Sequence, residues 1–152
     1  KPKIIQKTIK KIFFEGRLQY INKGKLRKYL NKNEKLILDG AHSNTSGKNL
    51  YNYLKTLKLP IYCIWGMQKN KQPQEFLKNF KGIFKEIVTF KIENESNALD
   101  AEQLERIANK QGYKSRPSNN IKHALKKISS KSKKVICVTG SLYGVGSVLK
   151  LN

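Results

Sequence analysis

Short apolar runs separated by longer amphipathic segments constrain this 152-residue chain more than any other feature. The runs cover residues 35–39, 61–66, 86–92 and 134–140, and the second and fourth are apolar almost throughout. Segments of helical period lie between them, an alternation that is typical of α/β folds. Strands that lack a polar face are usually covered by helices on both sides of a parallel sheet. The pattern therefore predicts an α/β fold with a mostly parallel sheet flanked by helices.

Four segments carry the signals of helices that could cover such a sheet, namely residues 45–57, 73–81, 100–111 and 119–129. Pro73 suits the first turn of the second helix. Asp100 and Gln103 have the spacing of a capping box at the start of the third, and Ser118 is the expected N-cap of the fourth.

The N-terminal quarter has weaker signals. Residues 2–13 have a helical period, residues 15–21 resemble a strand that leaves a turn, and the charge-rich residues 22–35 indicate an exposed hairpin or loop. A length of 152 residues fits one domain, so we expect residues 1–152 to form a single domain.

Cysteine usage and hydropathy both indicate the cytoplasm. Cys63 and Cys137 lie inside apolar runs, where we expect buried free thiols in a reducing compartment. No stretch approaches the roughly 20 apolar residues that a membrane span needs. The basic N-terminus also lacks the apolar core of a signal peptide.

The net charge of +22 raises the alternative of a basic nucleic-acid-binding α/β module. Of the 32 basic residues 28 are lysine, whereas base recognition favours the bidentate fork of arginine. The lysines are also spread over nearly every segment. We therefore expect a solvated lysine surface on a monomer and no nucleic-acid partner, and we keep the nucleic-acid module as the alternative.

Polar residues follow the apolar runs, and ligands of parallel sheets bind beyond the carboxyl ends of the strands. If the ends near residues 39, 65 and 139 converge, they bring together Asp39, His42, Ser43, Lys71, Thr139, Ser141 and Tyr143. Each residue also has a simpler explanation. Asp39 and His42 could be turn residues, and Lys71 could be one more solvated lysine.

Two kinds of site are not indicated by the sequence. Gly40 and Gly47 are separated by six residues and Lys48 precedes Asn49, so this stretch is not a P-loop. No P-loop occurs elsewhere in the chain. The chain also lacks paired Cys motifs and His-x-x-x-His, so we expect no metal ligands.

Four motifs together resemble the C-terminal domain of folylpolyglutamate synthase, which in bacteria is often also a dihydrofolate synthase. They are "EGRLQ" (15–19), "LILDGAHS" (36–43), "GMQKNK" (66–71) and "VTGSLYGVGSVL" (138–149). This family belongs to the Mur-ligase group of ADP-forming amide ligases. The resemblance implies a Rossmann-like domain that closes over ATP and works with an N-terminal P-loop ATPase domain absent from this chain.

The resemblance also implies roles for individual residues. Arg17 and Asp39 would contact ATP, and His42 would lie near the reacting phosphate or the incoming glutamate as the catalytic residue. The expected glutamate-binding residues are Ser43, Lys71, Ser141 and Tyr143. The implied cofactors are ATP and Mg²⁺, with the Mg²⁺ ligands on the N-terminal domain. The implied substrates are folate or dihydropteroate and L-glutamate, and the isolated chain would not catalyse.

Overall fold

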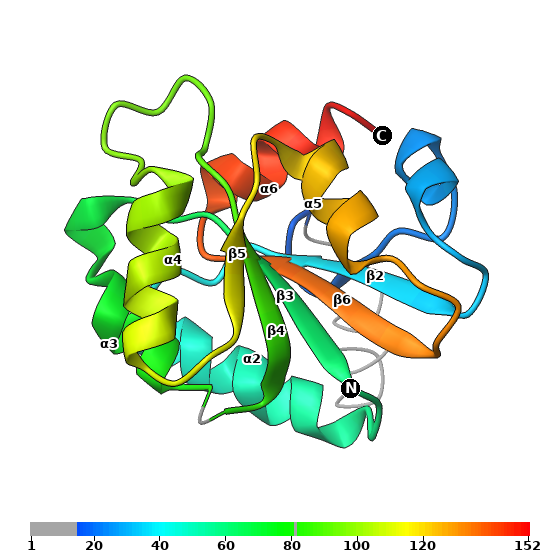
Figure 1. Ribbon diagram of the computed structural model, residues 1–152, viewed down its shortest axis with the longest axis horizontal. Coiled ribbons are helices and arrows are strands. Elements are labelled where there is room, and N and C mark those ends of the chain that lie inside the picture. Colours follow the sequence, from blue (N-terminus) through cyan, green and yellow to red (C-terminus); the bar gives the residue numbers. More distant parts are fainter. Residues whose placement is uncertain (1–14, 81) are drawn as a thin grey trace, which may run out of the picture.

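The computed structural model describes residues 15–80 and 82–152, which form a six-stranded sheet with helices on both faces (Figure 1). The strands, in chain order, are β1 (Gln19–Tyr20), β2 (Glu34–Asp39), β3 (Ile61–Trp65), β4 (Phe84–Thr89), β5 (Ser115–Pro117) and β6 (Lys134–Thr139). Their order across the sheet is β1-β2-β6-β3-β4-β5. β1 pairs antiparallel with β2, and the other pairs are parallel. The predicted α/β fold with a mostly parallel sheet is confirmed.

Helices cover both faces of the sheet. The helices are η1 (Lys25–Tyr29), α2 (Asn44–Thr56), η2 (Lys69–Lys71), α3 (Pro73–Lys78), α4 (Ala101–Lys110), α5 (Ile121–Ile128) and α6 (Leu142–Leu149), where η marks a 3₁₀-helix. Helices α2, α3 and α4 pack on one face, whereas η1, α5 and α6 pack on the other. None of the helices in the described ranges is long and apolar enough to cross a membrane.

The core divides into two layers because neighbouring strand residues point to opposite faces. Ile37 and Cys63 point toward α2, α3 and α4, whereas Leu36 and Ile64 point toward η1, α5 and α6. All four side chains are almost fully buried. Because these strands are buried on both faces, their apolar residues form continuous runs and do not alternate with polar residues.

Most predicted elements are present with small shifts of their ends, and the capping box of Asp100 and Gln103 is confirmed. The N-cap of α5 is Asn120 and not Ser118, because the Asn120 side chain accepts the His123 N–H at 3.0 Å. The predicted strand over 86–92 begins and ends earlier, at Phe84 and Thr89. The expected helix over 2–13 lies outside the described residues.

β5 and η1 are among the elements that were not predicted. β5 is short and carries no apolar pattern, and it forms by pairing with β4. The segment 22–35, predicted to be an exposed hairpin or loop, contains η1, whose Leu26 is fully buried under the sheet. One buried leucine among lysines is too weak a signal for a sequence pattern to detect.

Candidate functional site

The carboxyl ends of three neighbouring strands lie level with one another. Thr139 at the end of β6 pairs in register with Asp39 of β2 on one side and with Trp65 of β3 on the other. The predicted convergence of these three strand ends is therefore a property of the fold, and every segment that follows them starts from the same edge.

Glycines directly after these strands allow the backbone to pack closely. A Cβ atom on Gly40 would overlap the side chain of Leu142, and one on Gly140 would collide with the carbonyl oxygen of Gly66. Gly140 also has a φ of 109°, which L side chains rarely adopt. The strand ends and the first turn of α6 can therefore meet without side chains between them.

The turn that carries Arg17 is attached to the end of β2 by two hydrogen bonds. The Leu18 N–H donates to Oδ2 of Asp39 at 3.0 Å, and the Gly40 N–H donates to the Gly16 carbonyl at 2.7 Å. The Arg17 side chain itself is exposed. The motifs "EGRLQ" and "DGAH" are thus parts of one structure, in which the second motif fixes the position of the first.

The Gln19 side chain forms a hydrogen bond within the same turn. Its Oε1 accepts the Gly16 N–H at 2.9 Å, and Leu18 between them has a positive φ of 45°. Gly16 is buried against α6, where a Cβ would lie 2.9 Å from a methyl carbon of Val145. Non-glycine residues with positive φ are uncommon, so this turn is held in place by its contacts.

Asp39 is 5% exposed and both of its carboxylate oxygens accept backbone N–H groups. Burial raises the pKa of the Asp39 carboxyl above its usual value, and this effect exceeds the opposing effects of the two hydrogen bonds and of the nearby Arg17 charge. Asp39 is therefore a turn-forming residue, as its simpler explanation predicted. Its position still places Arg17 beside the strand ends.

His42 lies half-buried just beyond β2 with one ring nitrogen engaged. Its Nδ1 is 2.8 Å from the Gly40 carbonyl oxygen, which can only accept a hydrogen bond. Nδ1 therefore carries the hydrogen in this arrangement, and in the neutral ring Nε2 is left as an acceptor. Such a nitrogen can take a proton or a hydrogen bond from a ligand.

Ser43 and Ser141 each form the N-cap of a helix. The Ser43 hydroxyl accepts the Ser46 N–H at 3.1 Å at the start of α2, and Ser141 accepts the Gly144 N–H at 3.2 Å at the start of α6. Ser43 is exposed, whereas Ser141 is only 2% exposed. Both hydroxyls thus position helices at the strand-end edge, and Ser43 is the more accessible of the two.

A cavity of about 850 Å³ opens at this edge and brings together three of the predicted residues, His42, Lys71 and Tyr143. Its other lining residues are Gln68, Glu93, Asn94, Glu95, Leu142, Gly146, Ser147, Lys150 and Leu151. Tyr143 is 66% exposed, an unusual position for a large aromatic side chain. The cavity therefore combines cationic, anionic and aromatic groups.

A protein-family model describing the C-terminal domain of dihydrofolate synthetase matches residues 22–151. This chain belongs to that family. The match covers most of the chain and includes the strand ends and the cavity, so the resemblance drawn from four sequence motifs is confirmed. No curated protein sequence matches the chain at a significant level.

Solved structures of longer enzymes share the fold. The bifunctional folylpolyglutamate synthase/dihydrofolate synthase of Yersinia pestis CO92 has a TM-score of 0.78 at 20% identity, covering 99% of this chain and 34% of its own. A Mycobacterium tuberculosis folylpolyglutamate synthase complexed with ADP and AMPPCP has a TM-score of 0.79 at 17% identity, covering 99% of this chain and 35% of its own. An E. coli FolC structure in complex with DHPP and ADP has a TM-score of 0.76 at 18% identity, covering 99% of this chain and 34% of its own. This chain spans about a third of the length of these enzymes.

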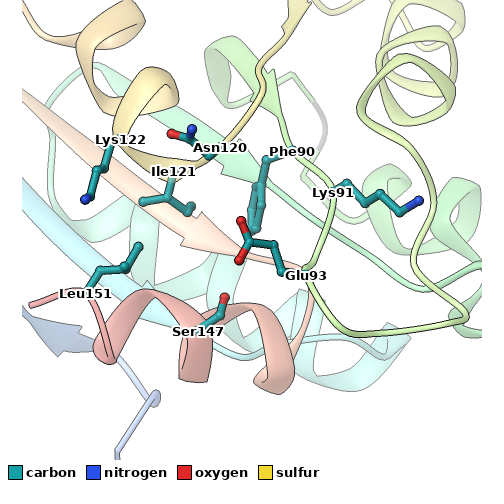
Figure 2. Close-up of a pocket in the computed structure, with 8 residues that line it drawn as sticks. All are labelled: Phe90, Lys91, Glu93, Asn120, Ile121, Lys122, Ser147 and Leu151. Carbon is teal, nitrogen blue, oxygen red and sulfur yellow. The ribbon is translucent and has the colours of Figure 1, made fainter.

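The predicted site left out the residues that follow β4 in this synthetase domain. Glu93, Asn94 and Glu95 line the cavity because β4 pairs with β3, so its end lies at the same edge. A smaller pocket shares Glu93, Ser147 and Leu151 with the cavity, and Figure 2 shows Glu93 directed into it. The polar run "ENESN" after an apolar strand was the available signal.

Across residues 15–80 and 82–152, no three His, Cys, Asp or Glu side chains form a group that could hold a metal ion.

Proposed function

We propose that residues 1–152 act as the C-terminal domain of a two-domain, ADP-forming amide ligase that adds L-glutamate to folate or dihydropteroate. In this reaction the acceptor carboxylate attacks the γ-phosphate of ATP, and ADP leaves. The amine of L-glutamate then attacks the acyl phosphate, and phosphate leaves as the amide bond forms. Family membership and the nucleotides named in the relatives' structures support this assignment.

The observation that carries the proposal is the attachment of the Arg17 turn to the end of β2. Asp39 and Gln19 hold this turn so that an exposed guanidinium stands at the strand-end edge. A guanidinium keeps its charge at all relevant pH values and donates a fork of hydrogen bonds that matches phosphate oxygens. We assign Arg17 to an ATP phosphate, and we assign the remaining lone pairs of Asp39 to hydroxyl groups of the nucleotide ribose.

The cavity suits a zwitterionic amino acid. Lys71 supplies a cation for a carboxylate of L-glutamate, while Glu93 and Glu95 on the loop after β4 can accept hydrogen bonds from its ammonium group. Mixed charge in a concave site orients a zwitterion more strictly than charge of one sign would. We assign Tyr143 to the rim of this glutamate site, and we assign Ser43 and Ser141, which do not line the cavity, to positioning α2 and α6 beside it.

His42 is the proposed catalytic residue because its Nε2 is an available acceptor at the cavity wall. The glutamate amine must lose protons to become a nucleophile and then an amide. A neutral imidazole is well suited to accept one at neutral pH. Its Nδ1–H bond to the Gly40 carbonyl would hold the ring in the required tautomer throughout.

The phosphates require groups that this chain does not supply. We propose that an N-terminal P-loop domain binds the triphosphate and Mg²⁺, which neutralises phosphate charge when bound. The isolated chain should therefore not turn over. We further propose a cytoplasmic monomer, in keeping with the two buried free thiols and the high net charge.

Reconstitution tests this proposal. The chain is mixed with a separately produced P-loop domain of the same enzyme family, and ADP release is measured with folate or dihydropteroate, L-glutamate and Mg²⁺–ATP. We expect ADP release that depends on every component. Arg17→Gln should raise the KM for ATP by at least about tenfold, since a charge-assisted contact contributes roughly 1.5–3 kcal/mol. Lys71→Gln should raise the KM for L-glutamate instead.

Lys58→Gln provides the matched control, because Lys58 is exposed in the loop after α2 and lines none of the pockets described above. It should leave both KM values within about twofold. The proposal fails if the reconstituted pair hydrolyses ATP equally well without L-glutamate. It also fails if Arg17→Gln and Lys58→Gln behave alike.

A further inference from the structure

We propose that η1, α5 and the loop after α5 form a surface that binds the phosphate backbone of double-stranded nucleic acid without reading its sequence. We call this surface the basic face. It is defined by exposed lysines on two segments: Lys23, Lys25, Lys28, Lys32, Lys126, Lys127, Lys131 and Lys133. The proposal does not use the strand-end cavity and is independent of the proposed function.

The fold brings together two segments that are about a hundred residues apart in the sequence. η1 and α5 pack on the same face of the sheet (Figure 1). The Lys126 ammonium lies 5.5 Å from the centre of the Tyr29 ring, and the Asn31 side chain donates to the Ser129 hydroxyl at 3.2 Å. Lysines that look scattered along the sequence therefore share one surface.

Acidic side chains are absent from both segments of the basic face, residues 22–33 and 119–133. The carboxylate nearest along the chain, Glu34, is 2% exposed and is occupied by Ser129, Ser130 and Lys134. It therefore cannot neutralise the exposed lysines, which repel one another until an anionic partner binds.

Other parts of the surface differ in this respect. Apart from Glu15, the carboxylates that are not buried in the described residues lie between residues 75 and 105. There, Glu75 pairs with Lys78 at 2.6 Å and Asp100 pairs with Lys91 at 2.8 Å. Charge is thus segregated between two regions of the surface, which net composition alone would not reveal.

The side chains of the basic face fit a phosphate backbone better than bases. Lysine neutralises phosphates as a point charge but does not match base edges as arginine does. The single arginine of the face, Arg27, donates to the carbonyls of Glu34 and Asn31 and is held within the fold. Recognition through phosphates alone is independent of sequence and steeply dependent on salt.

Duplexes are favoured over single strands because the face offers no exposed aromatic ring for stacking. Tyr29 is only half-exposed and lies beneath Lys126. Among the described residues, the one large aromatic side chain that is exposed is Tyr143, which lines the strand-end cavity. Proteins that bind single strands stack successive bases on aromatic side chains, and the basic face cannot do so.

Fluorescence anisotropy with labelled DNA and RNA duplexes of about 20 base pairs tests the proposal over a series of salt concentrations. In one variant Lys28, Lys32, Lys131 and Lys133 are replaced by Gln; in a matched control Lys48, Lys58, Lys85 and Lys110 are replaced by Gln. All eight are exposed, and both variants have the same net charge.

We expect the basic-face variant to bind duplexes at least about tenfold more weakly than the unmodified chain. The slope of log binding constant against log salt concentration should become shallower by about one for each lost phosphate contact. The control should stay within about threefold of the unmodified chain. Equal weakening in both variants would overturn the proposal, because binding would then follow net charge alone. Tighter binding of single strands, polyglutamate or anionic vesicles than of duplexes would overturn the assigned partner, as would the absence of duplex binding.

Discussion

Asp39 accepts two backbone hydrogen bonds at the end of β2, one from Ala41 in its own segment and one from Leu18 in the turn before β1. Both of its oxygens are thus occupied by structure before any ligand binds. A residue that the family resemblance assigns to ATP also holds the arginine that we assign to ATP phosphate. The structural role of Asp39 is compatible with a role in ATP binding, because the turn that Asp39 holds carries the arginine that we assign to ATP phosphate.

Replacing Asp39 by Ala should lower the free energy of unfolding by about 1–3 kcal/mol, because the Ala41 and Leu18 N–H groups lose their acceptors. Urea denaturation measures this change. Asp39→Asn keeps one acceptor oxygen and should lose less stability. An Ala variant as stable as the unmodified chain would show that these hydrogen bonds do not hold the turn.

Gln19 provides a second test of the same turn. Gln19→Leu removes the acceptor of the Gly16 N–H, whereas Gln19→Glu keeps an acceptor oxygen. We expect the Gly16 amide to exchange with solvent faster in the Leu variant by at least about fivefold, since a net hydrogen bond contributes about 1 kcal/mol. Similar exchange rates in the two variants would contradict the assigned role of Gln19.

At the scale of elements, the close approach of β6, β3 and α6 depends on Gly140. Gly140→Ala should lower the free energy of unfolding by about 2–4 kcal/mol, because the φ of 109° at this position is strained for alanine and a Cβ would collide with the Gly66 carbonyl oxygen. Gly146→Ala is the control within α6, where a Cβ has open space and helix propensity favours alanine. Thermal unfolding should show a loss for the first variant and a small gain for the second.

The strands β3 and β6 place Cys63 and Cys137 opposite each other as buried free thiols. Burial raises the pKa of both thiols, and the neighbouring Asp39 raises that of Cys137 further. The folded chain therefore keeps both protons at a pH where the unfolded chain releases them. This contribution to stability is complete below about pH 8.5, the ordinary cysteine pKa, and declines at higher pH.

Between pH 7.5 and pH 9.5, the urea midpoint of the unmodified chain should decrease more than that of a Cys63→Val, Cys137→Val variant, which lacks both thiols. A thiol reagent should label the folded chain only after unfolding. Equal pH dependence in the two proteins, or rapid labelling of the folded chain, would show that the thiols are not protected by burial.

At the scale of the whole molecule, the sequence predicts those parts that depend on local pattern. The apolar runs identify β2, β3, β4 and β6 because these strands are buried on both faces. β5 has no such pattern, because its pairing with β4 alone defines it. Leu26 is buried through contact with a distant helix, which no local pattern in residues 22–35 encodes.

The site was predictable to a similar extent. The polar residues after each strand could be named, and His42, Lys71 and Tyr143 do share a cavity. The order of strands across the sheet could not be read from the sequence, so the loop of Glu93 and Glu95 was left out of the predicted site. Charge segregation on the basic face was hidden for the same reason, since it depends on which segments become neighbours.

An amide-resolved NMR titration of the chain with Mg²⁺–ATP and then with L-glutamate tests the central claim most directly. ATP should shift the amides of Arg17 and of residues 39–43 and 139–143, and L-glutamate should shift those near Lys71 and Glu93. Both responses should be weak but saturable, because half of the proposed site is on another domain. Shifts confined to the basic face, with none at residues 39–43 or 139–143, would contradict a nucleotide site at the strand ends.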